Sequence, residues 1–223
     1  MVKFEFFFDC SSPWTYLAFS RIHSVLEKYS IRPIWKPILV GGVFNEVNKD
    51  IYIQRENPNP RKFKYSRKDM QDWAELSEVK IKWPSIFPVN AVKMMRIAII
   101  AEEENKLVEF VSLCFKSYWE DDLNVGDNDI LERILKNCGM DPSKTFHSIQ
   151  KETVKNKLRN NTESLIERGG FGSPTIFIND NDMYFGNDRI ELIEYKLNKL
   201  TKITWVRRNR NLAGIYLEKG RLT

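Results

Sequence analysis

The chain has 223 residues, 42% of them hydrophobic and 29% charged, which suits a folded protein with a sizeable core and excludes wholesale disorder. Its net charge of +5 resides at the C-terminus, because the residues from Lys199 onward carry seven basic side chains and one acidic one. Three scattered cysteines without a C-x-x-C pair exclude a disulfide framework and a zinc knuckle, and no apolar run reaches the roughly 18 residues of a membrane-spanning helix.

The N-terminal part of the sequence predicts a strand, a helix and a second strand. Residues 3–8 are rich in aromatic side chains and predict a buried strand; because Glu5 interrupts this short apolar stretch, we expect no signal peptide and a cytosolic protein. Ser12 followed by Pro13 is typical of an N-cap and a first helical residue, and apolar residues keep helical spacing through the following turns. Residues 31–39 then predict a second strand, with irregularities at its prolines.

The middle of the chain predicts a loop followed by a block of helices. Residues 41–67 contain a glycine pair and an Asn-Pro-Asn-Pro turn signal, and we expect them to be loop. Helical periodicity, interrupted by proline and glycine, then marks the segments 92–104, 107–119, 129–138 and 143–158.

The last elements predict two strands and a helix. Residues 175–178 and 183–185 flank a turn, and a helix is expected to begin at Asp188 with Glu191 as its capping partner. This element order is typical of an α/β protein with a thioredoxin-like domain and an inserted all-helical domain, although an unrelated α+β fold stays open on pattern alone. The expected divisions are 1–66 and 165–200 for the thioredoxin-like domain, 67–164 for the helical insertion and 201–223 for a basic tail.

The basic tail is the one segment where a nucleic-acid surface could lie, because Trp205 is followed closely by Arg207 and Arg208. We favour a solvated C-terminus over that alternative and expect no nucleic-acid partner and no membrane partner. Two histidines and three separated cysteines also leave little for a transition-metal site, so no metal is expected.

Three segments carry residues suited to chemistry. Ser12 would lie at the positive end of a helix, where a phosphate, a carboxylate or a thiolate is stabilised, or it is simply a cap. Pro174 can hold a cis bond that leaves the backbone of Ser173 free to pair with an extended peptide, or the segment is an ordinary turn. Asp188 and Arg189 suit the ammonium and carboxylate of an amino acid, or they are a cap and a surface residue.

Together with residues 41–48, these segments resemble the family that contains the kappa-class glutathione transferases and the 2-hydroxychromene-2-carboxylate isomerases. The resemblance covers about residues 2–200 and depends on the order and spacing of several motifs. They are Phe8-Asp9-x-x-Ser12-Pro13 with Tyr16-Leu17-Ala18, Lys36-Pro37-x-Leu39 leading to Gly42 and Asn48, Phe87-Pro88-x-Asn90, Gly172-x-Pro174, and Phe185-Gly186-x-Asp188-Arg189.

The resemblance implies a glutathione-using enzyme related to the disulfide oxidoreductase A family, with glutathione as the cofactor of an isomerase or the cosubstrate of a transferase. Ser12, followed by Pro13, matches the serine that hydrogen-bonds the glutathione sulfur. Ser173, before a cis-Pro174, matches the residue whose backbone pairs with the cysteinyl part of the tripeptide.

The remaining roles implied by the resemblance concern the two ends of the site. Asp188 and Arg189 match the residues that hold the γ-glutamyl end, and Asn48 matches a glutathione-contacting asparagine after a one-residue gap in the alignment. The inserted helices would wall the pocket for a small aromatic or electrophilic substrate, with Trp83 and Asn90 as candidates. The family also implies a homodimer.

Several functions are compatible with these glutathione-binding residues. A thiolate held by Ser12 serves an isomerase, which we expect, and equally a kappa-class transferase; a non-catalytic glutathione-binding protein would differ only in lacking turnover. A thiol–disulfide oxidoreductase needs cysteines where Ser12 and Thr15 stand, which excludes dithiol exchange unless Cys10 acts alone. Cys10 can also be a buried residue at the end of a strand.

Overall fold

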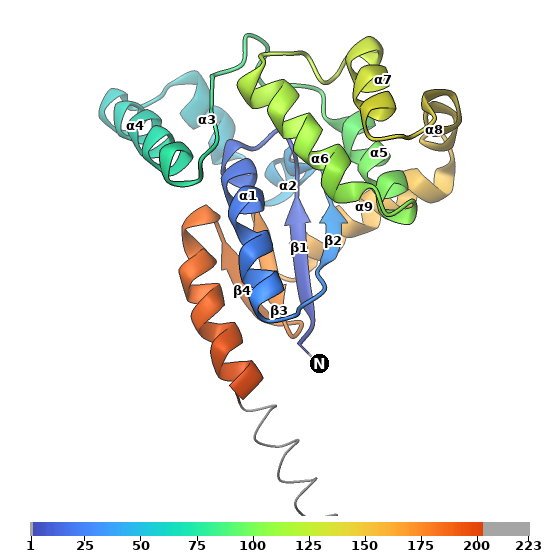
Figure 1. Ribbon diagram of the computed structural model, residues 1–223. Helices are drawn as coiled ribbons and strands as arrows, with labels where there is room; N and C mark the ends of the chain where they lie inside the picture. Colours follow the sequence, from blue (N-terminus) through green and yellow to red (C-terminus); the bar gives the residue numbers. More distant parts are fainter. Residues whose placement is uncertain (1, 203–223) are drawn as a thin grey trace, which may run out of the picture.

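A mixed four-stranded sheet lies at the centre of the computed structural model, which describes residues 2–202 (Figure 1). Its strands are β1 (Phe4–Phe8), β2 (Ile34–Pro37), β3 (Thr175–Ile178) and β4 (Asp182–Phe185), in the spatial order β2-β1-β3-β4. β1 pairs with β2 in parallel and with β3 in antiparallel fashion, and β4 is antiparallel to β3. All four strands are predicted by the sequence, and β2 is shorter than expected.

The helices surround this sheet. In chain order they are α1 (Pro13–Lys28), α2 (Val40–Val47), α3 (Asp50–Glu56), α4 (Pro60–Leu76), α5 (Val92–Glu103), α6 (Leu107–Phe115), α7 (Asn128–Asn137), α8 (Pro142–Ser148) and α9 (Glu152–Glu167). A π-helical turn, η1 (Lys116–Glu120), follows α6, and a 3₁₀ turn, η2 (Asn187–Arg189), follows β4. A C-terminal helix begins at Ile190 and continues to the last described residue, Lys202.

The alternation of side chains along β1 builds a core on both faces of the sheet. Phe6 and Phe8 pack with Trp35 and with residues of α1 and the C-terminal helix. Phe7 points to the opposite face, where it contacts Phe177 and packs with residues of α2 and α9. The strand β1 is therefore fully buried, and the helices cover the sheet from both sides.

The prediction that residues 41–67 form a loop is wrong, because this segment forms α2, α3 and the beginning of α4. The Asn-Pro-Asn-Pro signal belongs to a helix start. Asn59 accepts hydrogen bonds from the N–H groups of Arg61 and Lys62, and Pro60 occupies the first helical position, where it has no N–H to lose.

The prediction of one continuous helix over residues 143–158 is also wrong, because this segment is divided between two helices, α8 and α9. The N–H groups of Gln150 and Lys151 close a turn onto the carbonyls of His147 and Ser148, and Ile149 between them is buried. The C-terminal helix likewise starts later than expected. Asp188 lies within η2 and pairs with Arg189, so it is not the cap of that helix.

The carboxyl ends of β1 and β2 face several of the helices (Figure 1). In Figure 1 the strands β1 and β2 point towards α2, α5 and α6, with α3 and α4 on one side and α7 and α8 on the other. The arrangement is thioredoxin-like, with helices inserted between β2 and β3, as the sequence predicts. The expected domain boundaries at residues 67 and 164 fall inside α4 and α9, and the division into domains stays a prediction.

Two further sequence predictions concern membranes and the tail. Within residues 2–202, no helix is both long and apolar enough to cross a membrane. The basic tail, residues 201–223, lies outside the described residues apart from its first two positions, and with it the nucleic-acid alternative.

Candidate active site

Ser12 is the N-cap of α1, as the sequence predicts. Its backbone is extended, and its Oγ accepts a hydrogen bond from the N–H of Thr15 at 3.3 Å. The same hydroxyl donates to the backbone carbonyl of Ser173 at 3.0 Å. Ser12 is buried at the carboxyl end of β1, at the N-terminus of α1, where the helix dipole creates a positive potential. An anionic atom that reached this hydroxyl would therefore be stabilised.

The segment before β3 meets α1 at this point. The bond between Ser173 and Pro174 is cis, as predicted, and the antiparallel pairing of β3 with β1 brings the segment beside Ser12. The Ser173 hydroxyl accepts from the N–H of Asp9 at 2.9 Å and lies 2.7 Å from the Thr15 Oγ1. Among the described residues, the backbone N–H of Ser173 has no hydrogen-bond partner. This N–H therefore keeps its hydrogen-bonding capacity.

A buried carboxylate connects the Ser12 loop with α2. Asp9 accepts hydrogen bonds from the N–H groups of Ser11 at 2.9 Å and Val40 at 2.8 Å. Burial raises the pKa of the Asp9 carboxyl, and the two N–H donors oppose this rise because they favour the carboxylate. Asp9 thus holds the beginning of α2 against the loop that precedes Ser12.

Asn48 lies at the other end of α2, beside the segment that contains Ser173. Its Nδ2 donates to the carbonyl of Phe171 at 3.3 Å, and the Phe171 ring packs on Phe185 with centroids 4.4 Å apart. The structure therefore brings Asn48 to the same short segment as Ser173, although the two are far apart in sequence.

Asp188 and Arg189 lie in the turn that follows β4. Their carboxylate and guanidinium are 3.0 Å apart, and both side chains are nearly half exposed. The turn is joined to the cis-proline segment because the N–H of Gly186 donates to the carbonyl of Pro174 at 3.1 Å. Gly186 has a φ of +104°, a conformation that other residues rarely adopt.

The two substrate-pocket candidates have different surroundings. Trp83 contacts Phe87 with ring centroids 4.5 Å apart and Trp119 at 6.0 Å, and Trp119 donates from Nε1 to the Cys10 carbonyl at 3.0 Å. Trp83 therefore belongs to an aromatic wall that reaches the Ser12 loop. Asn90 is exposed at the start of α5, where its Oδ1 accepts the N–H of Val92 and supports the helix end.

Cys10 has the properties of a structural residue. Its side chain is fully buried, and burial, with smaller contributions from Cys114 and Asp9, raises the pKa of its thiol well above the ordinary value. A protonated and inaccessible thiol is a poor nucleophile. These observations support the interpretation of Cys10 as a buried strand-end residue and argue against thiol exchange through it.

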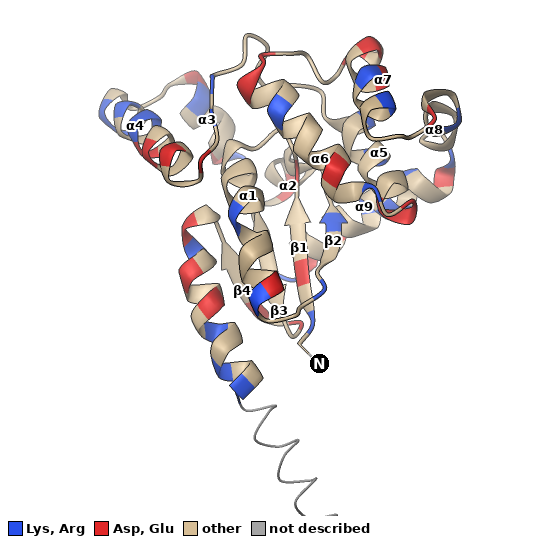
Figure 2. Ribbon diagram, viewed as in Figure 1, with Lys and Arg blue, Asp and Glu red and all other residues tan. Residues whose placement is uncertain are grey.

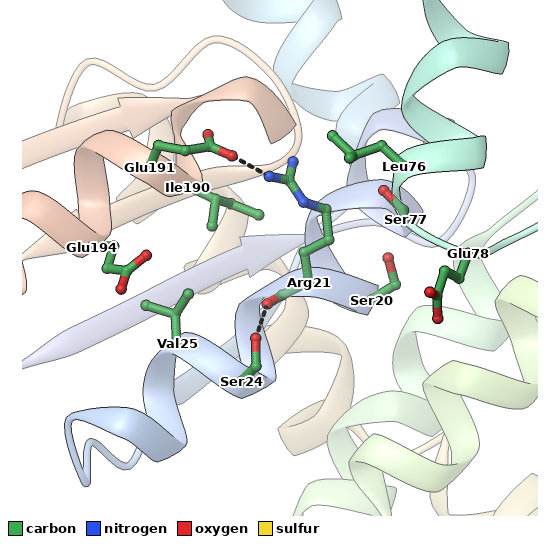
Figure 3. A pocket seen from close by; sticks show the side chains of 10 residues that line it. All are labelled: Ser20, Arg21, Ser24, Val25, Leu76, Ser77, Glu78, Ile190, Glu191 and Glu194. Carbon is green, nitrogen blue, oxygen red and sulfur yellow. Dashed lines mark hydrogen bonds and ion pairs between the residues drawn. The ribbon is translucent and has the colours of Figure 1, made fainter.

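A cleft of about 300 Å³ lies elsewhere, between α1, the end of α4 and the C-terminal helix (Figure 3). In it Arg21 is paired with Glu191, as Figure 3 shows. Lys28, which does not line the cleft, pairs with the lining residue Glu194 at 2.5 Å. None of the predicted site residues lines this cleft, whose charged lining residues are one arginine and three glutamates. We do not assign the chemistry to it.

Sequence reasoning missed the hydroxyl of Thr15, which it treated only as a replaced cysteine. Thr15 is fully buried, and its contact with Ser173 joins residues 158 positions apart. Its place three residues after Ser12 is a local signal, because the third residue of a helix offers its N–H to the cap. The contact with Ser173 leaves no such signal in the sequence.

The geometry can be compared with known proteins. A family model described as a DSBA-like thioredoxin domain matches residues 3–198. The chain belongs to this family. Within it, DsbA of Pseudomonas aeruginosa has a solved structure that is 12% identical, with a TM-score of 0.56 over 91% of this chain and 85% of that one, which shows the shared fold.

Two kinds of enzyme are more similar to this chain in sequence than that DsbA is. A 2-hydroxychromene-2-carboxylate isomerase of Pseudomonas putida is 26% identical, with 89% of this chain and 95% of that protein covered. Glutathione S-transferase kappa 1 of Rattus norvegicus is 27% identical, with 87% and 90% covered. A solved structure of 2-hydroxychromene-2-carboxylate isomerase is 25% identical, with a TM-score of 0.75 over 94% and 98% of the two chains. These relatives confirm the resemblance stated from the sequence.

Proposed function

We propose that the protein is a glutathione-dependent enzyme, an isomerase of the 2-hydroxychromene-2-carboxylate type. The observation that carries the proposal is the meeting of the Ser12 hydroxyl and the Ser173 backbone at the positive end of α1, 3.0 Å apart. A kappa-class transferase that uses the same site is the alternative, since relatives of both names match the chain over most of its length.

The residues around Ser12 fit a tripeptide with a thiol. In this proposal the free N–H of Ser173 pairs with the cysteinyl backbone. Pro13 follows Ser12 and Pro174 follows Ser173, and Asn48 is hydrogen-bonded to the Phe171 carbonyl of the same segment. The exposed pair Asp188 and Arg189 is placed to hold the amino-acid end, because it offers both signs of charge to a zwitterion. When bound, glutathione supplies a thiolate nucleophile that adds to an electrophilic carbon of the second substrate.

The task of Ser12 is to make the thiol ionise at neutral pH. A free thiol has a pKa of about 8.5, and lowering it by about two units takes roughly 2.7 kcal/mol of preferential stabilisation of the thiolate. The hydroxyl of Ser12 turns from the Ser173 carbonyl to the sulfur and donates a charge-assisted hydrogen bond, which the positive end of α1 reinforces. The buried surroundings strengthen both interactions because they exclude water.

The second substrate of the proposed enzyme is an aromatic or electrophilic small molecule that meets the wall containing Trp83. A homodimer and a cytosolic location are part of the same proposal and depend on the sequence alone. A monomeric mass in light scattering at working concentration would contradict the dimer.

The proposal is tested in two steps. Calorimetry with reduced glutathione should show one site per chain, and no heat at millimolar glutathione would remove the central claim. Turnover is then measured with an aromatic cis-enone acid, whose isomerisation must depend on glutathione without consuming it, and with a halonitrobenzene. Glutathione-dependent isomerisation supports the isomerase; conjugation without isomerisation supports the transferase. Binding without either activity would favour a non-catalytic glutathione-binding protein.

A further inference from the structure

Two arginines lie over the aromatic wall of the site. The Arg67 guanidinium carbon lies 3.8 Å from the centroid of the Trp83 ring, and that of Arg55 lies 5.3 Å from the centroid of Phe87. Because Trp83 and Phe87 contact each other, the two cations cover neighbouring parts of one aromatic surface. The helices α3 and α4 therefore each place one guanidinium against this pair of rings.

Each guanidinium is held by a second ring as well. Arg67 lies 5.0 Å from the centroid of Phe63 on its own helix, and Arg55 lies 5.5 Å from that of Phe44 on α2. A guanidinium that touches rings through its face keeps its N–H donors, which lie in its own plane, for other partners. Both guanidinium groups are thus in contact with two aromatic rings each.

No carboxylate neutralises these two cations within residues 2–202. Arg21 and Arg168 have ion pairs with Glu191 and Glu5, whereas Arg55 and Arg67 have neither an ion pair nor a side-chain hydrogen bond to any described residue. Desolvation lowers the pKa of Arg67, as expected for a cation held against rings without a counter-charge. Figure 2 shows basic residues along the first part of α4 and acidic residues towards its other end, whereas α3 carries Asp50 and Glu56 besides Arg55.

The aromatic surface is continuous with the Ser12 loop. Trp83 and Phe87 both contact Trp119, at 6.0 and 6.3 Å between ring centroids, and the Trp119 indole donates to the carbonyl of Cys10. Phe44 belongs to α2, whose first N–H is bound by Asp9 of the same loop. A ligand that lay on Trp83 and Phe87 would accordingly lie beside the reaction centre proposed above.

We propose that Arg67 and Arg55 bind the carboxylate of the second substrate and that its ring packs beside Trp83 and Phe87. The two arginines then determine specificity, because they select aromatic acids over neutral aromatic electrophiles. The planar fork of a guanidinium matches a carboxylate with two parallel hydrogen bonds, and the low polarity of the rings strengthens the attraction. That the ligand is a substrate depends on the proposed function; that it is an anion with an aromatic ring does not.

The test compares cinnamate with cinnamamide, which share a ring and a conjugated double bond and differ in one charged group. Each is titrated by calorimetry into the wild-type protein, with and without saturating reduced glutathione. We expect the wild type to bind cinnamate at least tenfold more tightly. In Arg67→Gln and Arg55→Gln the ratio should fall towards one, because the affinity for cinnamate is lost while that for cinnamamide is kept.

Two further variants serve as controls. Arg61→Gln removes the same charge from the exposed first turn of α4, and it should keep the wild-type ratio. Arg67→Lys keeps the charge but not the planar fork, and it should retain a weaker preference for cinnamate. Circular dichroism of every variant verifies the fold.

Equal affinities in the wild type, or no binding of either compound, would overturn the proposal. So would an equal loss of selectivity in Arg61→Gln, since that result would show only long-range attraction by net charge. A protein that binds no glutathione would instead contradict the proposed function. The titration of cinnamate into the free protein would still decide the role of the arginines.

Discussion

The hydroxyl of Ser12 donates to the backbone carbonyl of Ser173 across 161 positions of the chain. The Ser12 hydroxyl proton, which we propose stabilises the thiolate, is thus already hydrogen-bonded to this carbonyl in the structure. A peptide N–H that pairs with the Ser173 carbonyl would compete for the same acceptor, so binding of the peptide backbone favours transfer of the Ser12 hydrogen bond to the sulfur. In the proposed mechanism, the positioning of glutathione and the activation of its thiol would therefore be linked through the Ser173 carbonyl.

Replacing Ser12 tests this role. Ser12→Ala removes a cap and should lower the free energy of unfolding by about 1 kcal/mol. If the hydroxyl also holds the thiolate, loss of a charge-assisted hydrogen bond of about 1.5–3 kcal/mol should raise the pKa of bound glutathione by about one to two units, read from the ultraviolet thiolate band. Ser24→Ala, on the exposed side of α1, should leave the titration unchanged. An unmoved thiolate band in Ser12→Ala would restrict Ser12 to capping.

The contact between Thr15 and Ser173 should contribute to stability. Thr15→Val keeps the shape of the side chain and removes a buried hydroxyl that lies 2.7 Å from the Ser173 hydroxyl. We expect the free energy of unfolding in urea to fall by about 1 kcal/mol, because one buried hydrogen bond is lost. Thr15→Ser retains the hydroxyl and should lose less stability than Thr15→Val. Unchanged stability in Thr15→Val would contradict this contribution of the hydrogen bond.

Asp188 is expected to matter for binding and little for folding. Its side chain is 43% exposed and pairs only with Arg189 among the described residues, so Asp188→Ala should keep the melting temperature within a few degrees. Calorimetry should show glutathione binding weakened at least tenfold. The matched control is Glu191→Ala, which removes a carboxylate that pairs with Arg21, on the first turn of the C-terminal helix. If both variants weaken glutathione binding equally, the loss reflects the change in net charge and not a specific contact of Asp188.

Gly186 is required by the turn that carries Asp188. An added Cβ would lie 2.6 Å from the Asp188 carboxylate, in a backbone conformation with φ of +104°. Gly186→Ala should therefore displace Asp188, weaken glutathione binding and lower stability by about 1 kcal/mol or more. Gly41→Ala is the control, since an added Cβ meets no atom within 4 Å and replaces glycine inside α2. It should be neutral or slightly stabilising in thermal melts, with unchanged binding.

Asp122 should make the protein sensitive to acid. The N–H and hydroxyl of Ser85, with Lys82, lower the pKa of Asp122 to about 2. Because the folded-state value lies below the ordinary one of about 3.9, this stabilisation is complete above the ordinary value and is lost as the pH falls through 2. In urea unfolding, the stability advantage of the wild type over Asp122→Asn should be largest at pH 6 and shrink towards pH 2. Parallel pH profiles would contradict this assignment.

Local patterns in the sequence determined the elements whose stabilising contacts lie within a few residues. The N-cap of α1 was predictable because Ser12 is followed by Pro13 and bonds the N–H three residues on. The strands β1 and β3 were predictable from their aromatic and β-branched runs. The prediction failed at α2, since its glycine pair is typical of loops, while the helix is held by the distant Asp9 carboxylate and by packing of Val43 in the core.

The same distinction applies to the site. The sequence by itself determined which residue types stand at the Ser12, Ser173 and Asp188 positions, and their order was enough to indicate the family. Only the tertiary structure decided that the Ser12 hydroxyl meets the Ser173 carbonyl and that Arg67 lies on Trp83. Contacts between particular residues distant in the chain depend on how helices and strands pack, and the period of the apolar residues shows which face of an element is buried but not which residue it meets.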